Sequence, residues 1–81
     1  MRYAAIVDVM PKPGIADPQG QTIERALPAL GYGGISEIRV GKRIELELEA
    51  ESPEAARERV LEMCERLLAN PVIEAYEVTI R

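Results

Sequence analysis

Residues 35–50 read ISEIRVGKRIELELEA, and their pattern decides the fold. Apolar side chains share one parity of this stretch: Ile38, Val40, Ile44, Leu46, Leu48 and Ala50. Charged side chains share the other parity: Glu37, Arg39, Arg43, Glu45, Glu47 and Glu49. Alternation with a period of two is typical of a β-strand that buries one face. The stretch therefore predicts β-structure with an apolar inner face and a charged outer face.

The glycine in the middle of this stretch leaves two arrangements open. A two-residue turn at Gly41 would pair Ile38 with Glu45 and mix the two faces, so the pattern argues against it. A three-residue loop pairs Val40 with Ile44 and keeps each face uniform. A single long strand through Gly41 keeps the parity as well, and half of so long a strand would then pair with a neighbouring chain.

The residues before this stretch predict a strand and then a helix. Residues 2–10, RYAAIVDVM, are rich in apolar and β-branched types, which indicates a strand. Asp17 is suited to cap the helix, because its carboxylate can accept a backbone N–H of the first turn, and Pro18 fits the first helical position. Apolar residues at helical spacing continue to residue 30, and Gly31 is well placed to end the helix.

Pro28 lies inside this predicted helix. It has no N–H to donate to the carbonyl of Glu24, and a proline in a helix interior costs about 3 kcal/mol or bends the helix. We therefore expect a helix over residues 18–30 that is bent or loosened between Glu24 and Pro28.

The segment DPQG, residues 17–20, could start this helix or form a phosphate-binding loop. Gly20 belongs to no G-x-G-x-x-G or P-loop pattern, and no Lys-Ser or Lys-Thr pair follows it. The Asp17 carboxylate would also compete with an anion for the free N–H groups of the first turn. The segment therefore predicts a helix start rather than a ligand loop.

The second helix is the clearest element of the sequence. Ser52 is a typical cap, and Pro53 occupies the first helical position. An apolar stripe follows at helical spacing: Ala56, Val60, Met63, Cys64 and Leu67. Asn70 fits a left-handed position at the end of the helix, and residues 72–80 predict the last strand.

The order of elements is therefore β-α-β-β-α-β. This order predicts an α+β fold with an antiparallel sheet and two helices on one face, in the ferredoxin-like arrangement. The length of 81 residues allows one domain, residues 1–81. So small a chain often gains stability from self-association, and we expect an oligomer.

Composition excludes several functional classes. The net charge of −4 argues against nucleic acid as a partner. Histidine is absent, which removes the commonest general base and zinc ligand. Cys64 is the only cysteine, so no disulfide forms within the chain, and its place on the apolar stripe predicts a buried thiol. We expect no catalytic, cofactor or metal site, no signal peptide, no membrane segment and a cytoplasmic location.

Charge and exposure select the candidate interface residues: Asp17, Gln19, Gly20, Arg39, Lys42, Arg43, Glu45 and Glu47. The basic residues beside Gly41 could bind a phosphate or a partner's carboxylate, but such a cluster is more often a solvated turn or pairs with nearby glutamates. The carboxylates of Glu45, Glu47 and Glu49 could bind a divalent cation. Alternate strand positions lie about 6.5–7 Å apart, so these carboxylates do not converge as a cation requires. A solvated or intersubunit face is the favoured interpretation.

Three ordered segments resemble the PurS family. KPGIADPQG, residues 12–20, resembles the family's K-P-G-x-x-D-P-Q-G signature. LGYGGISEIRVGKRIELEL, residues 30–48, resembles its L-G-Y…R-V-G-K-x-I-E-L segment. MCERLLANPVIEAYEV, residues 63–78, resembles its M-C-E-x-L-L-A-N-P-V-I-E-x-Y segment. The resemblance covers essentially the whole chain and implies a PurS-like fold.

The resemblance also implies a function. PurS is the small subunit of phosphoribosylformylglycinamidine synthase, an enzyme of de novo purine synthesis that converts formylglycinamide ribonucleotide, glutamine and ATP into formylglycinamidine ribonucleotide, glutamate, ADP and phosphate. A glutaminase subunit releases ammonia, and a large synthetase subunit uses ATP and Mg²⁺ to add it. The small subunit is expected to be non-catalytic, to bind no cofactor, to form a dimer or tetramer with itself, and to bring the other two subunits together, with a contribution to ammonia transfer.

A second hypothesis is a stand-alone ferredoxin-like module that senses a small molecule. It rests on an analogy at the level of the fold only. Saturable binding of a nucleotide or an amino acid by the isolated protein would favour it over the assembly subunit.

Overall fold

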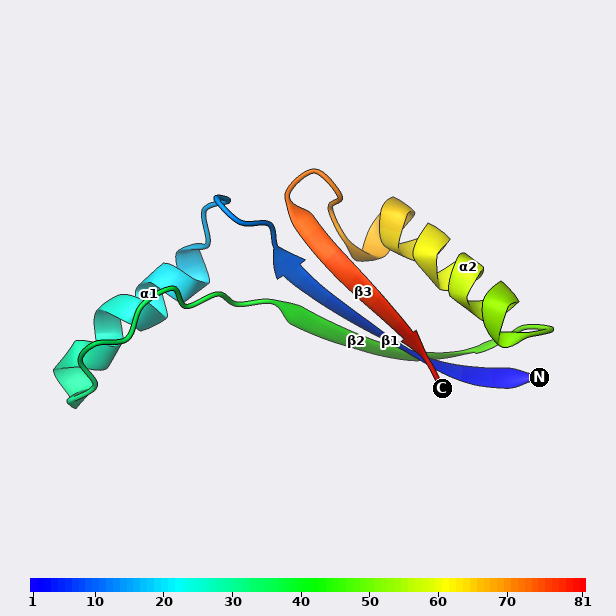
Figure 1. The fold of residues 1–81 in the computed structure, drawn as a ribbon, viewed down its shortest axis with the longest axis horizontal. Coiled ribbons are helices and arrows are strands. Elements are labelled where there is room, and N and C mark those ends of the chain that lie inside the picture. Colours follow the sequence, from blue (N-terminus) through cyan, green and yellow to red (C-terminus); the bar gives the residue numbers. More distant parts are fainter.

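The computed structural model describes residues 1–81. The elements are β1 (Arg2–Pro11), α1 (Pro18–Ala26), the 3₁₀ turn η1 (Leu27–Leu30), β2 (Lys42–Glu49), α2 (Pro53–Met63), the π-helical turn η2 (Cys64–Leu68) and β3 (Glu74–Ile80). Figure 1 shows that they form an elongated molecule in which α1 lies at one end and α2 at the other.

The three strands form one antiparallel sheet in the order β2-β1-β3. The central strand pairs with both neighbours: Val7 lies opposite Ile44 of β2 and opposite Val78 of β3. The α+β class and the antiparallel sheet predicted from the sequence are confirmed. The alternation in β2 is confirmed too, because Leu48 is buried and Ile44 packs against the core, whereas the glutamates between them are exposed.

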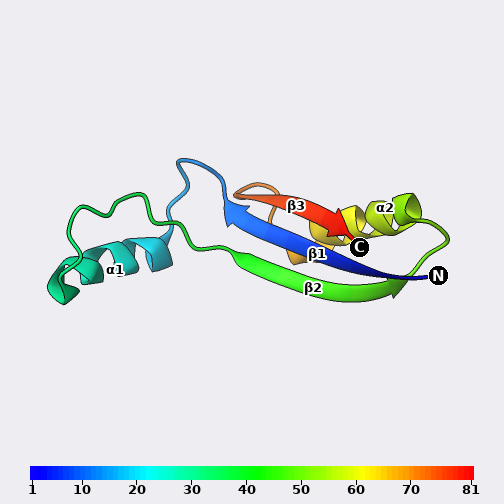
Figure 2. The same ribbon diagram turned by 60° about the horizontal axis from the view of Figure 1, so that its bottom comes forward.

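Helix α2 covers one face of the sheet, as the two views in Figures 1 and 2 agree. The core lies between this helix and the sheet, and its residues are Ala5, Val7, Val9, Leu48, Ala56, Val60, Cys64 and Val78. Two side chains fasten the helix to both edge strands: Arg57 donates to the carbonyl of Val78 and Arg59 to the carbonyl of Glu49, each at 2.7 Å. No helix covers the opposite face of the sheet.

Residues 35–41 have no strand partner within the chain. The three-residue hairpin considered at Gly41 does not form, and the backbone instead continues in line with β2 (Figure 1). Gly41 passes very close to the end of β1, since a Cβ atom there would lie 2.2 Å from the carbonyl oxygen of Val9. The predicted order β-α-β-β-α-β fits, with this segment in the place of the second strand, although it forms no strand within this chain and Glu37 has a left-handed φ of 59°.

We call residues 12–41 the arm and the remaining residues the body. Helix α1 lies in the arm and has no extensive contact with the sheet or with α2, so only one of the two helices covers the sheet within this chain. The radius of gyration is 16.3 Å, whereas a compact domain of this length has one of roughly 12 Å. The shape is therefore that of a small packed body with a projecting arm.

Both helix starts agree with the sequence. The Asp17 carboxylate accepts the N–H of Gly20, and the Ser52 hydroxyl accepts the N–H of Ala55. The first helix loosens into the 3₁₀ turn η1 where Pro28 stands, and Gly31 ends it with a left-handed φ of 96°.

The end of the second helix differs from the expectation. The N–H of Ala69 donates to the carbonyl of Cys64, five residues earlier, so the last turn is wider than an α-helical turn. This turn rotates Leu67 off the apolar stripe, and Leu67 is 83% exposed, while Leu68 packs against the core in its place. Asn70 has no positive φ, and its side chain instead accepts the N–H of Val72.

Candidate interaction surface

Asp17 lies at the start of α1, the end of this helix nearer the body (Figure 1), and its carboxylate makes two hydrogen bonds. One oxygen accepts the N–H of Gly20 at 3.1 Å, and the other accepts the N–H of Val40 at 2.8 Å. The bond from Val40 is the larger cause, followed by that from Gly20, of a pKa of Asp17 below its ordinary value. One side chain thus joins the start of α1 to the segment before β2.

Gly20 is the buried residue of α1, and the reason is a close backbone approach. A Cβ atom at this position would lie 2.4 Å from the carbonyl oxygen of Ile38 and 2.7 Å from a carboxylate oxygen of Asp17. Any side chain would therefore force the first turn of α1 away from the neighbouring segment. The DPQG segment starts a helix, as predicted, and its glycine also allows this contact.

Two basic side chains tie the base of the arm to the body. The guanidinium of Arg39 donates to the carbonyl of Pro11, and the ammonium of Lys12 donates to the carbonyl of Pro71 at 2.7 Å. Because the guanidinium of Arg39 is bonded to Pro11, Arg39 does not form one basic cluster with Lys42 and Arg43. Gln19 and Lys42 are both exposed, on the first turn of α1 and at the start of β2.

The uncovered face of the sheet carries a second group of the candidate residues. Arg43 lies 3.5 Å from the carboxylate of Glu45 and 3.9 Å from that of Asp8, and Arg2 lies 2.7 Å from that of Glu47. These pairs are exposed, and exposed ion pairs contribute about 0–1 kcal/mol each. The candidates therefore form two separate groups, one at the base of the arm and one on this face.

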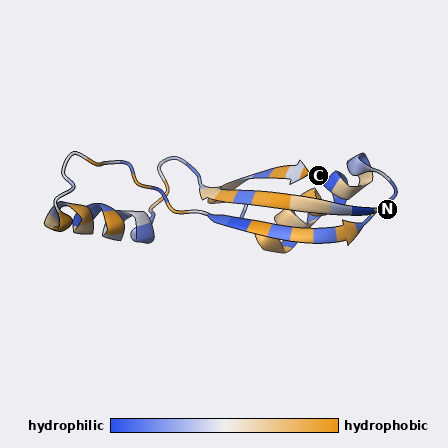
Figure 3. Cartoon of the chain, turned by 90° about the horizontal axis from the view of Figure 1, so that it is seen from below, coloured by the Kyte–Doolittle hydropathy of each residue, from blue (hydrophilic) through white to orange (hydrophobic).

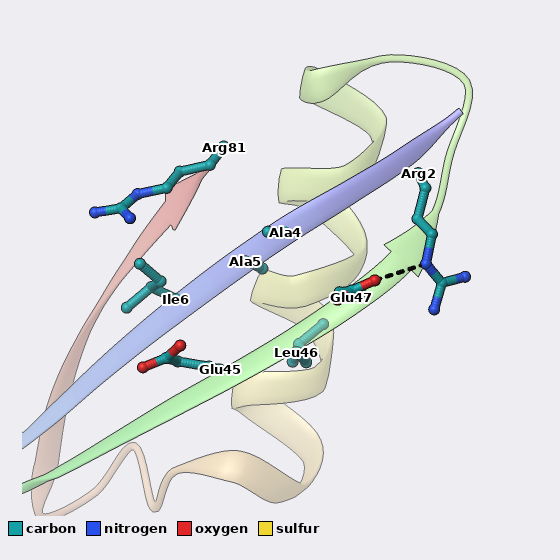
Figure 4. A pocket seen from close by; sticks show the side chains of 8 residues that line it. All are labelled: Arg2, Ala4, Ala5, Ile6, Glu45, Leu46, Glu47 and Arg81. Carbon is teal, nitrogen blue, oxygen red and sulfur yellow. Dashed lines mark hydrogen bonds and ion pairs between the residues drawn. The ribbon is translucent and has the colours of Figure 1, made fainter.

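A shallow hollow of about 450 Å³ lies on this face. Its small floor residue, Ala4, pairs through its backbone with Arg81, and lies opposite Glu47 of β2. Figure 4 shows the side chains of Ile6, Glu45 and Arg81 on one side of the hollow and the Arg2–Glu47 pair on the other. The arrangement offers opposite charges around a small apolar floor.

The glutamates of β2 pair with cations of the chain itself. Glu47 and Glu49 both pair with Arg2, and Glu49 also lies 3.6 Å from the N-terminal ammonium. No group of three or more metal-ligating side chains is placed to hold an ion. Neither helix has the length and apolar content that crossing a lipid bilayer requires.

Two titratable side chains of the body, Cys64 and Tyr76, have structural roles. Cys64 is completely buried, and burial raises the pKa of its thiol, which disfavours the nucleophilic thiolate. The hydroxyl of Tyr76 donates to the carboxylate of Glu65, and this bond raises the pKa of Tyr76 to about 12. The buried thiol predicted from the sequence is confirmed.

Several apolar side chains are exposed on the arm, and the choice of candidate residues by charge did not include them. Leu30 is 71% exposed, and Ile23, Tyr32 and Ile35 are exposed beside it in sequence. Figure 3 shows apolar residues along α1 and the segment that follows it, with no other element against them. The helical spacing of Ile23, Leu27 and Leu30 is the signal that could have identified this surface.

Comparisons with known proteins agree on one family. The family model described as PurS, phosphoribosylformylglycinamidine (FGAM) synthase, matches residues 4–81. Phosphoribosylformylglycinamidine synthase subunit PurS of Methanocaldococcus jannaschii is 44% identical over 78 residues, which cover 96% of this chain and 94% of the relative. The subunit of the same name from Thermotoga maritima is 47% identical over 72 residues, which cover 89% and 88%.

Solved structures give the same result. A chain in the structure of PurLQS from Thermotoga maritima superimposes with a TM-score of 0.88 at 42% identity, covering 100% of this chain and 99% of that one. The crystal structure of PurS from Methanocaldococcus jannaschii superimposes with a TM-score of 0.84 at 42% identity, covering 98% and 95%.

Proposed function

The chain belongs to the PurS family of phosphoribosylformylglycinamidine synthase, and from this premise we propose that it is the non-catalytic assembly subunit of that enzyme. It brings the glutaminase and the large synthetase subunit together for a step of purine synthesis and aids the transfer of ammonia between them. ATP and Mg²⁺ are bound and used by the large subunit. Residues 1–81 act as one PurS-like domain in the cytoplasm.

The observation that carries this proposal is the uncovered arm. The chain exposes 5839 Å² of surface, whereas a compact monomer of 9.0 kDa exposes roughly 4,900 Å². The excess is about the area that each partner buries in a protein–protein interface of standard size, roughly 800 Å². A chain that leaves this much surface uncovered, and that exposes apolar side chains such as Leu30 on a projecting arm, is suited to bind other chains.

The first of these chains is a second copy. Strand β2 has a free edge, because β1 pairs with only one side of it. Residues 35–41 are unpaired and run in line with β2 (Figure 1). When two copies exchange arms, residues 35–41 of each copy can pair with the free edge of β2 in the other copy. This is the shared-strand arrangement that the alternation through Gly41 allows.

Helix α1 of the second copy then has a place on the body. A shallow hollow of about 360 Å³ beside α2 is lined by Arg59, Met63 and Leu67 among others. Its Arg59 donates to the carbonyl of Glu49, so this side of α2 faces β2, where the second copy's strand segment would lie. The apolar residues of α1 can cover the exposed Leu67 there.

The charged candidates serve the contacts with the other two subunits in this proposal. Arg43, Glu45 and Glu47 remain on the uncovered face of the sheet after two copies exchange arms, because the arm packs on the face that carries α2. The hollow above Ala4 gives that face a site for an apolar side chain between charged neighbours. Gln19 and Lys42 are exposed and extend the candidate surface.

Reconstitution tests the proposed function. The purified chain is mixed with the glutaminase and synthetase subunits, formylglycinamide ribonucleotide, ATP, Mg²⁺ and ADP, and product formation is measured with either glutamine or ammonium as the nitrogen source. We expect the glutamine-dependent reaction to require the chain and the ammonium-dependent reaction not to require it. Equal glutamine-dependent rates and equal complex formation with and without the chain would overturn the proposal.

A further inference from the structure

The two helices of the chain begin with nearly identical caps. Asp17 precedes Pro18 and accepts the N–H three residues later at 3.1 Å, while Ser52 precedes Pro53 and accepts the N–H three residues later at 3.0 Å. The caps differ in one respect. The second carboxylate oxygen of Asp17 accepts the N–H of Val40 at 2.8 Å, 23 residues away, and the hydroxyl of Ser52 has no such second partner.

The contact between Asp17 and Val40 decides how α1 is held. Helix α1 lacks extensive contact with the sheet or with α2. Its first turn instead lies against the segment before β2, where Gly20 leaves room for the carbonyl of Ile38. The two bonds of one carboxylate therefore link the helix and the unpaired strand segment, and no apolar core of the chain itself holds these two parts together.

We propose that Asp17 is a positioning residue for self-association, whose carboxylate clamps α1 to residues 38–40 so that the arm meets a second copy as one preformed unit. The inference rests on the proposed exchange of arms between two copies. Fixing the helix and the strand segment in their bound arrangement before association reduces the ordering entropy that binding has to overcome. The clamp therefore acts mainly on the dissociation constant and little on the fold of the body.

The chemistry of the residue is matched to this role. A carboxylate has two acceptor oxygens and can receive two N–H groups from different directions. Serine keeps a single hydroxyl, which is enough for the cap, as Ser52 shows in α2. The variant Asp17→Ser consequently retains the cap and removes the bond to Val40.

Two measurements on the full chain test the clamp. The first is amide hydrogen exchange of Gly20, Val40 and the β1 residues, at a protein concentration well above the dissociation constant of self-association. The second is that dissociation constant itself, measured by sedimentation. Glu24→Gln is the matched control for the loss of one negative charge on the arm, since no hydrogen bond or ion pair holds Glu24. Ser52→Ala is the control for the loss of a helix cap in the body.

We expect Asp17→Ser to speed the exchange of the Val40 amide and to raise the dissociation constant roughly tenfold, as the loss of a charge-assisted hydrogen bond predicts. The Gly20 amide and the β1 amides keep their protection. Glu24→Gln changes neither quantity, and Ser52→Ala speeds exchange in the body.

Three results count against the inference and are distinguishable. If Asp17→Ser associates as tightly as Glu24→Gln, the clamp is wrong while the exchange of arms stands. If Asp17→Ser loosens the β1 amides as much as the Val40 amide, Asp17 is a residue of the general fold. If the unmodified chain is a monomer at every concentration, the proposed self-association fails, and the inference fails with it.

Discussion

The body and the arm of this chain each contain a helix with the same local start signals, but only the helix of the body has its apolar side covered. Each has a helix with a polar cap and a proline at its first position, at Asp17-Pro18 and at Ser52-Pro53. Helix α2 buries its apolar side chains on the sheet, whereas α1 keeps its own exposed. The caps therefore decide where a helix begins, and the packing partner decides whether its apolar side is covered.

The comparison explains why so small a chain carries so much apolar surface on its arm. An exposed side chain such as Leu30 contributes little to the fold of its own chain, and burying it fully is worth roughly 1.5–3 kcal/mol. That free energy is available for binding another chain. The apolar side chains of the arm thus stabilise the structure only when another chain binds and covers them.

The largest expected effect separates the core of the body from the arm. Val60 lies on α2 and is completely buried against the sheet, so Val60→Ala should lower the free energy of unfolding by about 2 to 3 kcal/mol at every protein concentration. Leu30→Ala acts only through association, so its effect should grow with concentration. Urea unfolding over a hundredfold range of concentration measures both. Parallel concentration dependence of the two variants would remove the distinction between body and arm.

A second prediction concerns the point where the arm leaves the body. Gly41→Ala places a Cβ atom 2.2 Å from the Val9 carbonyl oxygen, and the shift it forces should cost about 2 kcal/mol. Gly33→Ala is the matched control, because no heavy atom lies within 4 Å of its Cβ position. Thermal unfolding compares the two variants. Equal melting temperatures would mean that the close approach of Gly41 to the end of β1 is absent in solution.

The arm should lose its clamp in acid. The pKa of Asp17 is lowered from its ordinary value of 3.8, so the contribution of its carboxylate is present above that value and is lost as the pH falls through the lowered pKa. The carboxyl ¹³C signal of Asp17 should titrate with a midpoint below 3.8. Asp17→Ser identifies the signal by removing it. A midpoint at or above 3.8 would contradict the two hydrogen bonds.

The body should show the smallest effect, at the opposite end of the pH range. The bond to Glu65 raises the pKa of Tyr76 from its ordinary value of 10 to about 12, so the contribution is complete below pH 10 and is lost as the pH rises through 12. Phenolate absorbance should show an ionisation step near pH 12 that Tyr76→Phe removes. Glu65→Gln should move the step toward 10, and an unchanged step in that variant would contradict the assignment.

Local features of the fold could be predicted from the sequence because they depend on neighbouring residues. The two caps, the loosening at Pro28 and the alternation of β2 all belong to this class. The bond from Val40 to Asp17 could not be predicted, since it joins residues far apart and has no pattern of its own. The outward turn of Leu67 was also missed, because apolar spacing alone does not distinguish a π-helical turn from an α-helical one.

For the candidate site too, the sequence predicted local properties of single residues but not how residues far apart in the chain are grouped. Charge selected Asp17, which the structure leaves half-buried, and Arg39 and the β2 residues, which it leaves exposed. Charge alone could not separate the group at the base of the arm from the group on the sheet face. The sequence did not indicate that the apolar residues of the arm are exposed, because helical spacing predicts an apolar side without saying which chain covers it.

Concentration-dependent amide exchange tests the central claim most directly. The claim is that the arm pairs with a second copy of the chain. The amides of residues 35–39 should therefore exchange slowly at protein concentrations above the dissociation constant and lose their protection on dilution below it. The amides of β1 that pair with β3 provide the internal reference. Protection of residues 35–39 that is the same at every concentration, or absent at every concentration, would contradict the account.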